Sequence, residues 1–363
     1  MKIKYLLFAL PFFLMSCNQQ SKAQFDNYVY LTEDSIPVLQ ELELERVDLP
    51  KGLGEYSGLD IYHDSILLVQ HTQPKPYVVS VYNLNTMKLM GEFLESTEEM
   101  NSYLNQRDNR YYVELTPRMS FGNPPREVFC FNLDSLVMMG QSYNPRKYTF
   151  SGAEFWSFDA LTDTSFLFYN HHYMENCGNK ANESMPELFT CGLDGHIDYQ
   201  MPEGFSRISG NPTAHIVSDL NRGKVFIPYN NTPQFTLLNS NLDTLKIVYG
   251  PDPLIENEYE RLEFDNQIRL VRYNRFSWNP LSTENYIIVP NDRICNVPRE
   301  NMQEISNNRM TEIFKFDWDG NLQARYEANN LFGLSSYSES TNTLYLEYYD
   351  ENQDLVLYKA KLK

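Results

Sequence analysis

The sequence has few cysteines, and none of them is arranged for redox or metal chemistry. Five cysteines occur in 363 residues and no C-x-x-C pair is present, so a redox dithiol and a cysteine zinc site are not indicated. The chain also lacks the motifs G-x-S-x-G, S-x-x-K and H-E-x-x-H and any phosphate-binding glycine loop. The sequence therefore indicates no catalytic residues, no metal ligands and no cofactor.

Long apolar runs and a surplus of positive charge are also missing. The apolar stretch at residues 5–15 is too short for a membrane-spanning helix, which needs about 20 residues. The chain holds 48 acidic and 30 basic residues, and its formal charge of −18 argues against nucleic acid as a partner. Lys2 and Lys4 precede the apolar stretch, and a basic start followed by a short apolar segment is typical of a signal peptide.

Leu14-Met15-Ser16-Cys17 resembles the bacterial lipobox, in which an aliphatic residue and small residues precede an obligatory cysteine. The resemblance implies cleavage after Ser16 and acylation of Cys17 with a diacylglycerol and a further acyl chain such as palmitate. Several acyl chains would hold the protein on a lipid bilayer without a membrane-spanning helix. Asn18 stands where an aspartate would signal inner-membrane retention, which favours the outer membrane, on its periplasmic or its outer surface. An ordinary signal peptide that contains a cysteine is the alternative.

Aromatic residues are abundant, with 26 Tyr, 22 Phe and 3 Trp, and they favour β-strands. A strand, a turn of Asn, Asp or Gly, and a second strand recur along the chain. The five copies lie at 79–93, 127–141, 187–201, 234–248 and 312–326. Their spacing fits propeller blades of roughly 40–50 residues with loop insertions. One segment, 92–107, reads as either a short helix or a loop.

Two further strand-like runs precede most of these hairpins, which gives units of four strands. A sixth unit at the C-terminus runs out of chain after three strands. The alternating segment 38–49 stands alone before the first unit and can supply the missing strand, which would close the ring and cover an open edge. We therefore predict an all-β, six-bladed β-propeller whose N-terminal strand closes the last blade. Two β-sandwiches are the alternative.

The blade rhythm over residues 38–363 resembles that of the TolB-like six-bladed propeller lipoproteins of Gram-negative envelopes. The most specific segments are "FKFDWDGNLQARYE" (314–327) and "LSSYSESTNTLYLEYY" (334–349). The resemblance implies a strand, an Asp-x-Asp-Gly turn, a strand, and then the first two strands of the last blade. The chain divides accordingly into a signal peptide (1–16), a lipidated cysteine and tether (17–37), and the propeller (38–363).

Two clusters of potential metal ligands fit a turn and a surface loop better than metal sites. The run 317–321, "DWDGN", begins like a calcium loop, but the twelfth position holds Ala328 instead of an acid, so we interpret it as a hairpin turn. His171, His172, Glu175 and Cys177 lie close together in sequence. Adjacent histidines on a strand point to opposite faces, so we interpret this segment as a surface loop.

The fold favours a membrane-anchored, non-enzymatic binding module of the envelope, whose partner is an unknown envelope protein or glycan. The alternative is a propeller enzyme that acts on glycans or peptides at the envelope. Long loops on a rigid scaffold often form binding sites, which points to the insertions 171–187 and 291–311. Both are expected to join the second strand of a blade to the third and to emerge on one face. Cys177 and Cys191 flank the first insertion closely enough to form a disulfide.

Overall fold

The structure is a computed structural model. It describes residues 28–32, 35–49, 56–75, 77–95, 100–107, 110–117, 126–150, 157–162, 165–169, 188–192, 197–200, 215–229, 233–250, 258–261, 268–276, 280–294, 311–328, 333–350 and 355–363. Within these residues, no helix is long and apolar enough to cross a membrane.

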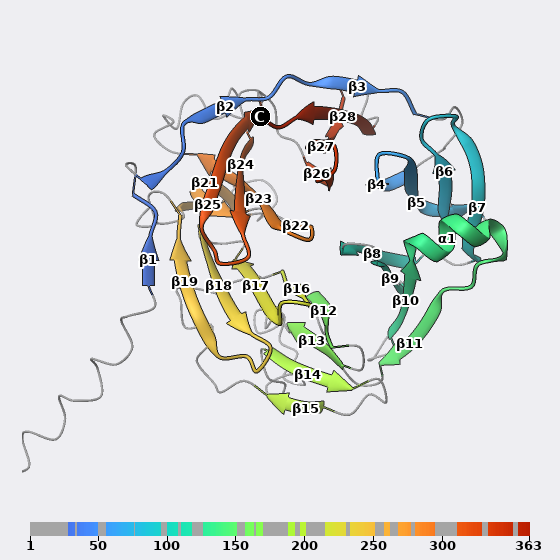
Figure 1. The fold of residues 1–363 in the computed structure, drawn as a ribbon, viewed down its shortest axis with the longest axis horizontal. Helices are drawn as coiled ribbons and strands as arrows, with labels where there is room; N and C mark the ends of the chain where they lie inside the picture. The colour runs from blue at the N-terminus through green and yellow to red at the C-terminus, as the bar shows by residue number, and fades with distance from the viewer. Residues whose placement is uncertain are drawn as a thin grey trace, which may run out of the picture.

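Six antiparallel sheets surround a central axis as the blades of a propeller (Figure 1). Blade 1 contains β4 (Tyr56–Tyr62), β5 (Ile66–Lys75), β6 (Tyr77–Asn83) and β7 (Lys88–Glu95). Blade 2 contains β8 (Met100–Arg107), β9 (Arg110–Pro117), β10 (Arg126–Asn132) and β11 (Arg146–Phe150). Blade 3 contains β12 (Ser157–Thr162), β13 (Ser165–Tyr169), β14 (Leu188–Gly192) and β15 (Ile197–Gln200).

The other three blades follow in chain order and confirm the predicted six-bladed, all-β architecture. Blade 4 contains β16 (Val217–Asp219), β17 (Lys224–Tyr229), β18 (Gln234–Asn239) and β19 (Thr244–Tyr249). Blade 5 contains β20 (Glu258–Arg261), β21 (Ile268–Phe276), β22 (Leu281–Ser282), β23 (Tyr286–Ile294), β24 (Thr311–Asp317) and β25 (Leu322–Ala328). Blade 6 contains β26 (Gly333–Ser338), β27 (Thr343–Tyr349) and β28 (Leu355–Lys361).

The middle strands of the blades are apolar on both faces because each blade packs between two neighbours. On β5, the consecutive residues Leu67, Leu68 and Val69 are all fully buried. A strand buried on both faces shows a continuous apolar run instead of alternation. Aromatic rings fill the space within and between blades; Phe226 and Phe235, for example, stack with their centroids 4.2 Å apart.

The ring is closed by β3 (Glu45–Val47), as the isolated segment 38–49 predicts. This strand pairs antiparallel with β28 and becomes the fourth strand of blade 6, with Val47 opposite Leu357. The last blade is thus built from both ends of the described chain. Just before β3, Leu42 is only 8% exposed and packs in the core shared by blades 5 and 6.

Two further N-terminal strands extend this closure around the rim. β1 (Tyr28–Tyr30) pairs in parallel with β19 of blade 4, and β2 (Leu39–Glu41) pairs in parallel with β25 of blade 5. We call residues 28–47 the N-terminal strap, which follows the outer edges of blades 4, 5 and 6 in turn (Figure 1). β1 lies inside the range 17–37 that the sequence assigned to the tether, so the tether prediction now concerns residues 17–27.

Two local predictions are wrong. The predicted hairpin at 127–141 continues after β10 as α1 (Leu133–Met139) and a 3₁₀ turn (Gly140–Ser142). Asn132 caps this helix by accepting a hydrogen bond from the Ser135 N–H at 2.8 Å. Segment 92–107, read as a short helix or a loop, instead supplies the end of β7 and all of β8.

Candidate functional site

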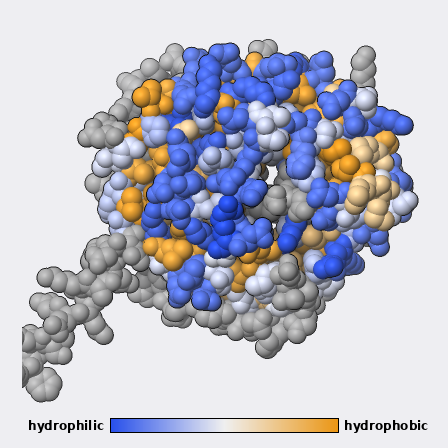
Figure 2. Space-filling view, viewed as in Figure 1, coloured by the Kyte–Doolittle hydropathy of each residue, from blue (hydrophilic) through white to orange (hydrophobic). Residues whose placement is uncertain are grey.

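One face of the disc carries the connections from the first strand to the second in the blades, and from the third to the fourth in the blades whose four strands are consecutive in the chain. We call it the hairpin face. Figure 2 shows that its surface is mostly hydrophilic around the central opening. Near the axis, residues from blades 2, 3, 4 and 5 line a pocket of about 90 Å³, which we call the mouth pocket. Its lining includes Arg110, Asp159, Arg222, Glu284 and Trp318.

The turn between β16 and β17 presents Arg222 to this pocket. The Asp219 carboxylate accepts hydrogen bonds from the backbone N–H groups of Asn221 at 2.8 Å and Arg222 at 2.9 Å. An aspartate that bonds the backbone of its own loop is a common turn former. Gly223 completes the turn with a φ of 58°, in the left-handed region that glycine adopts without strain.

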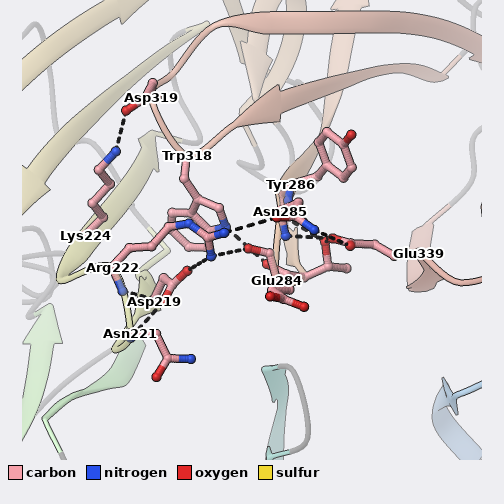
Figure 3. Close-up of polar contacts among 11 residues, drawn as sticks. Asp219, Asn221, Arg222, Lys224, Glu284, Asn285, Tyr286, Trp318, Asp319 and Glu339 are labelled. Carbon is pink, nitrogen blue, oxygen red and sulfur yellow. Dashed lines mark hydrogen bonds and ion pairs between the residues drawn. The ribbon is translucent and has the colours of Figure 1, made fainter.

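The Arg222 guanidinium then joins blade 4 to blade 5. It forms an ion pair with Asp219 over 2.6 Å and donates across the blade boundary to the Glu284 carbonyl and the Asn285 side-chain oxygen (Figure 3). The bond to Asn285 is 3.1 Å long. Because the guanidinium is planar and carries five N–H groups, one side chain can make all of these contacts.

Glu339 makes the equivalent connection between blades 5 and 6. Its carboxylate accepts from the backbone N–H of Asn285 at 2.7 Å, from the Asn285 side-chain amide at 2.9 Å and from the Thr283 hydroxyl (Figure 3). The Thr283 carbonyl in turn accepts from the Trp318 indole N–H at 3.1 Å. The loop that carries Glu284 is therefore held from both sides.

The acidic run 317–321 is the hairpin turn between β24 and β25, as its sequence indicates. Asp317 accepts from the backbone N–H groups of Asp319 and Asn321, both at 2.9 Å. Asp319 pairs with Lys224 of blade 4, and this hydrogen-bonded lysine lowers the pKa of the Asp319 carboxyl (Figure 3). The carboxylates in this turn thus form hydrogen bonds and an ion pair within the protein.

Polar side chains also join the innermost strands of neighbouring blades. Between blades 3 and 4, Asp159 accepts from the Ser218 backbone N–H at 2.8 Å. Between blades 6 and 1, the Ser336 hydroxyl accepts from the Ile61 backbone N–H at 3.0 Å. These bonds satisfy backbone groups along the channel wall that a neighbouring strand would satisfy elsewhere in a sheet.

Two partly buried acidic side chains, Glu347 and Asp60, lie where blades 6, 1 and 2 meet. Glu347 on β27 accepts a hydrogen bond from the Leu59 backbone N–H of β4. Burial, with a further contribution from the charge of Asp60, raises the pKa of Glu347 to about 8. Burial also raises the pKa of Tyr111 on β9, and the charges of Asp60 and Glu347 add to the effect. Glu347 therefore holds its proton at neutral pH.

Most of the residues predicted as sites lie outside the described residues. This applies to Cys17, Cys177, the segment 171–187 and residues 295–310. Cys191 lies in β14 and is 1% exposed. Because Cys177 lies outside the described residues, the disulfide between the two cysteines stays a prediction. The described strand ends that flank the two insertions, those of β13 and β14 in blade 3 and of β23 and β24 in blade 5, lie at the edge of the disc opposite the hairpin face. Among the described residues, no three His, Cys, Asp or Glu side chains gather as metal ligands.

Sequence reasoning missed the residues that the blades bring together. Arg222 follows Asp219 within a turn-forming segment, and that local pattern indicates an exposed turn at this position. Glu347 was signalled by a lone acid within an otherwise apolar and aromatic strand. Neither pattern indicates an interaction partner, because Glu284 approaches Arg222, and Asp60 approaches Glu347, only when the blades pack side by side.

The comparisons with known proteins concern the fold. No protein-family model matches the chain, and no curated protein matches its sequence. A solved structure of a member of the duf4221 family from Bacteroides vulgatus is 10% identical, with a TM-score of 0.52, and the match covers 89% of this chain and 96% of the other.

Two weaker matches are a protein from Bacteroides fragilis described as a candidate exported protein and the β-propeller domain of Cps50 from Myceliophteria thermophila. The first is 12% identical, with a TM-score of 0.49 and coverage of 93% and 99% of the two chains. The second is 11% identical, with a TM-score of 0.44 and coverage of 88% and 100%. At these identities, likeness to solved structures shows the fold alone: the chain is a six-bladed β-propeller.

Proposed function

We propose that this chain is a membrane-anchored, non-enzymatic binding module of the bacterial envelope and that its partner, an envelope protein or a glycan, inserts a polar group into the mouth pocket. The observation that carries the proposal is the convergence of side chains from four blades on one pocket at the axis. Binding sites are concave and combine a few convergent polar groups with a rigid frame. The bonds of Arg222 and Glu339 across the blade boundaries supply that frame.

The size of the mouth pocket suits a protruding group better than a whole small molecule. Its 90 Å³ is well below the roughly 300–1,000 Å³ of small-molecule sites. It offers the cations Arg110 and Arg222 next to the carboxylate of Asp159 and the indole of Trp318. A side chain or a sugar hydroxyl that both donates and accepts hydrogen bonds matches this lining.

The anchor is the second part of the proposal. We place the protein on the outer membrane through acylated Cys17, with kinship to the TolB-like lipoproteins. The N-terminal strap supports this arrangement because β1 brings the chain to the outer edge of blade 4, on the rim of the disc (Figure 1).

An enzyme that acts on glycans or peptides is the second candidate, favoured by the raised pKa of Glu347 beside Asp60. Perturbed carboxyl groups that face one another are typical of catalytic acids and bases. Neither Glu347 nor Tyr111 lines the mouth pocket, and Tyr111 is fully buried, whereas a general acid has to reach its substrate. Binding at the mouth pocket is therefore the better-supported function.

Cys17→Ala is expected to release the protein from membranes, because acylation of Cys17 is the proposed attachment to the bilayer. The measurement is the share of the protein in the membrane fraction of fractionated cells, together with the mass of the mature N-terminal peptide. Cys130→Ala, in β10, is the matched control and should stay with the membranes. Retention of the Cys17 variant after detergent-free washing would contradict the anchor.

A photo-reactive residue at Asn221, an exposed position in the mouth-pocket lining, is expected to form a covalent adduct with one defined partner in intact cells. The same residue at Met138, which is 80% exposed on the rim, is the control and should not yield that adduct. Adducts are identified by mass spectrometry. An adduct obtained only from Lys180, within the predicted loop site 171–187, would move the binding site from the mouth pocket to that loop.

A further inference from the structure

The outer edge of blade 4 carries a stack of tyrosines at the point where the chain reaches the propeller. β1 is held in register against β19, with Tyr30 opposite Tyr249 and a hydrogen bond of 2.9 Å from the Leu31 N–H to the Tyr249 carbonyl. The rings of Tyr30 and Tyr28 stack on that of Tyr249, with centroids 4.8 and 6.0 Å apart. The position of these rings on the rim is therefore fixed by backbone pairing.

Several large apolar and aromatic side chains on this edge are exposed to solvent. Tyr30 is 58% exposed, Val29 is 38% exposed and Leu245 on β19 is 41% exposed. We call Tyr28, Val29, Tyr30, Leu245 and Tyr249 the tyrosine rim. Tyrosine combines an apolar ring with a polar hydroxyl and is enriched where a bilayer meets water.

The length of the preceding chain limits how far the tyrosine rim can lie from the proposed anchor. Tyr28 follows Cys17 by eleven residues. Such a segment spans at most about 36–40 Å when fully extended, and about 17–20 Å on average as a flexible coil. A chain anchored at Cys17 would therefore bring the tyrosine rim close to the membrane surface.

A second apolar patch competes for this role. In α1, Val137, Met138 and Met139 are 40%, 80% and 52% exposed, and Figure 2 shows the apolar surface over this helix. α1 lies across the disc from β1, on the far side of the central axis (Figure 1). A tether of eleven residues would thus bring the tyrosine rim, and not the α1 patch, to the bilayer.

We infer that the tyrosine rim rests in the headgroup region of the bilayer to which Cys17 is attached, so that the disc stands with its rim on the membrane. This inference rests on the proposed acylation of Cys17. In this orientation both flat faces of the propeller stand roughly perpendicular to the bilayer, and the mouth pocket opens to the aqueous compartment.

The test uses the mature, acylated chain reconstituted into phosphatidylcholine vesicles with or without brominated acyl chains, which quench tryptophan fluorescence at short range. Tyr30→Trp reports on the tyrosine rim, and Met138→Trp is the matched control on α1. Each is compared with the parent chain, which contains three tryptophans. Intact mass establishes acylation, and thermal melting establishes that both variants fold like the parent.

We expect the additional emission of the Tyr30→Trp chain to shift to the blue and lose intensity in brominated vesicles, and that of the Met138→Trp chain to do neither. Hydrogen–deuterium exchange of the parent chain should likewise slow in β1 when vesicles are present. An acylated chain whose position 30 is not quenched, or whose position 138 is quenched equally, would overturn this orientation and leave the anchor intact. A mass without acyl chains would overturn the anchor and the orientation together.

Discussion

Deletion of residues 38–49 is expected to abolish cooperative folding of the propeller. The deletion removes β2 and β3, so blade 6 loses its fourth strand and β28 is left as an open edge. It also removes Leu42 from the core, where truncation of a buried leucine to alanine alone costs about 2–5 kcal/mol. Since domains are stable by only about 5–15 kcal/mol, the summed loss approaches the whole free energy of unfolding. Thermal and urea unfolding followed by circular dichroism measure the effect.

Two point substitutions within the deleted segment distinguish the loss of core contacts from the loss of exposed residues. Leu42→Ala should lower the free energy of unfolding by about 2–5 kcal/mol, whereas Val38→Ala, at a position that is 85% exposed, should change it by less than about 0.5 kcal/mol. If the deleted chain melts within a few degrees of the complete one, the closure by β3 does not stabilise the ring.

Glu347→Gln is expected to remove a large pH dependence of stability between pH 4.5 and about 8. In this window the folded chain keeps the Glu347 proton, because burial and Asp60 raise its pKa to about 8, while the unfolded chain has released it. The stabilisation is complete below pH 4.5 and is lost as the pH rises toward 8. The free energy of unfolding of the native chain should thus fall, relative to that of the glutamine variant, by up to about 1.4 kcal/mol per pH unit.

Asp64→Asn is the matched control for this pH series. Burial alone would raise the pKa of Asp64, but hydrogen bonds from Ser338, Thr341 and Tyr345 lower it on balance below the usual value of 3.8. The stability that it contributes is present above pH 3.8 and is lost only at more acidic pH. Its difference from the native chain should be flat from pH 4.5 to 8, and a flat difference for Glu347→Gln would show that the carboxyl group titrates normally.

The sequence predicted the blades and their closure because both depend on local patterns. The turn that ends at Asp243, the turn that follows Asp317 and the apolar run around Leu68 indicate hairpins and a buried strand from local sequence alone. β1 was missed because a strand of three residues has no period, and the division of segment 38–49 into β2 and β3 was missed because their partners, β25 and β28, lie far along the chain. α1 was missed because Asp134, read as a turn residue, occupies the first turn of a short helix capped by Asn132.

The candidate site could be predicted only in outline. The turn around Asp219 is local, but the contacts of Arg222 with Glu284 and Asn285 arise from the angle between adjacent blades. The pKa of Glu347 likewise depends on its burial in the folded chain and on the charge of Asp60 from blade 1. The insertions 171–187 and 291–311 stay predictions, since most of their residues lie outside the described part of the chain.

The N-terminal strap also has a mechanical consequence for a protein held by its N-terminus. A force applied at the proposed anchor would reach β1 first, then β2, and only then β3, which closes the ring. The two outer attachments are three-residue strands laid on complete blades, so they can detach under load while all six blades keep their own strands. Under force, β1 and β2 would therefore detach in turn and lengthen the N-terminal segment before the force reaches β3 and the closure of the ring.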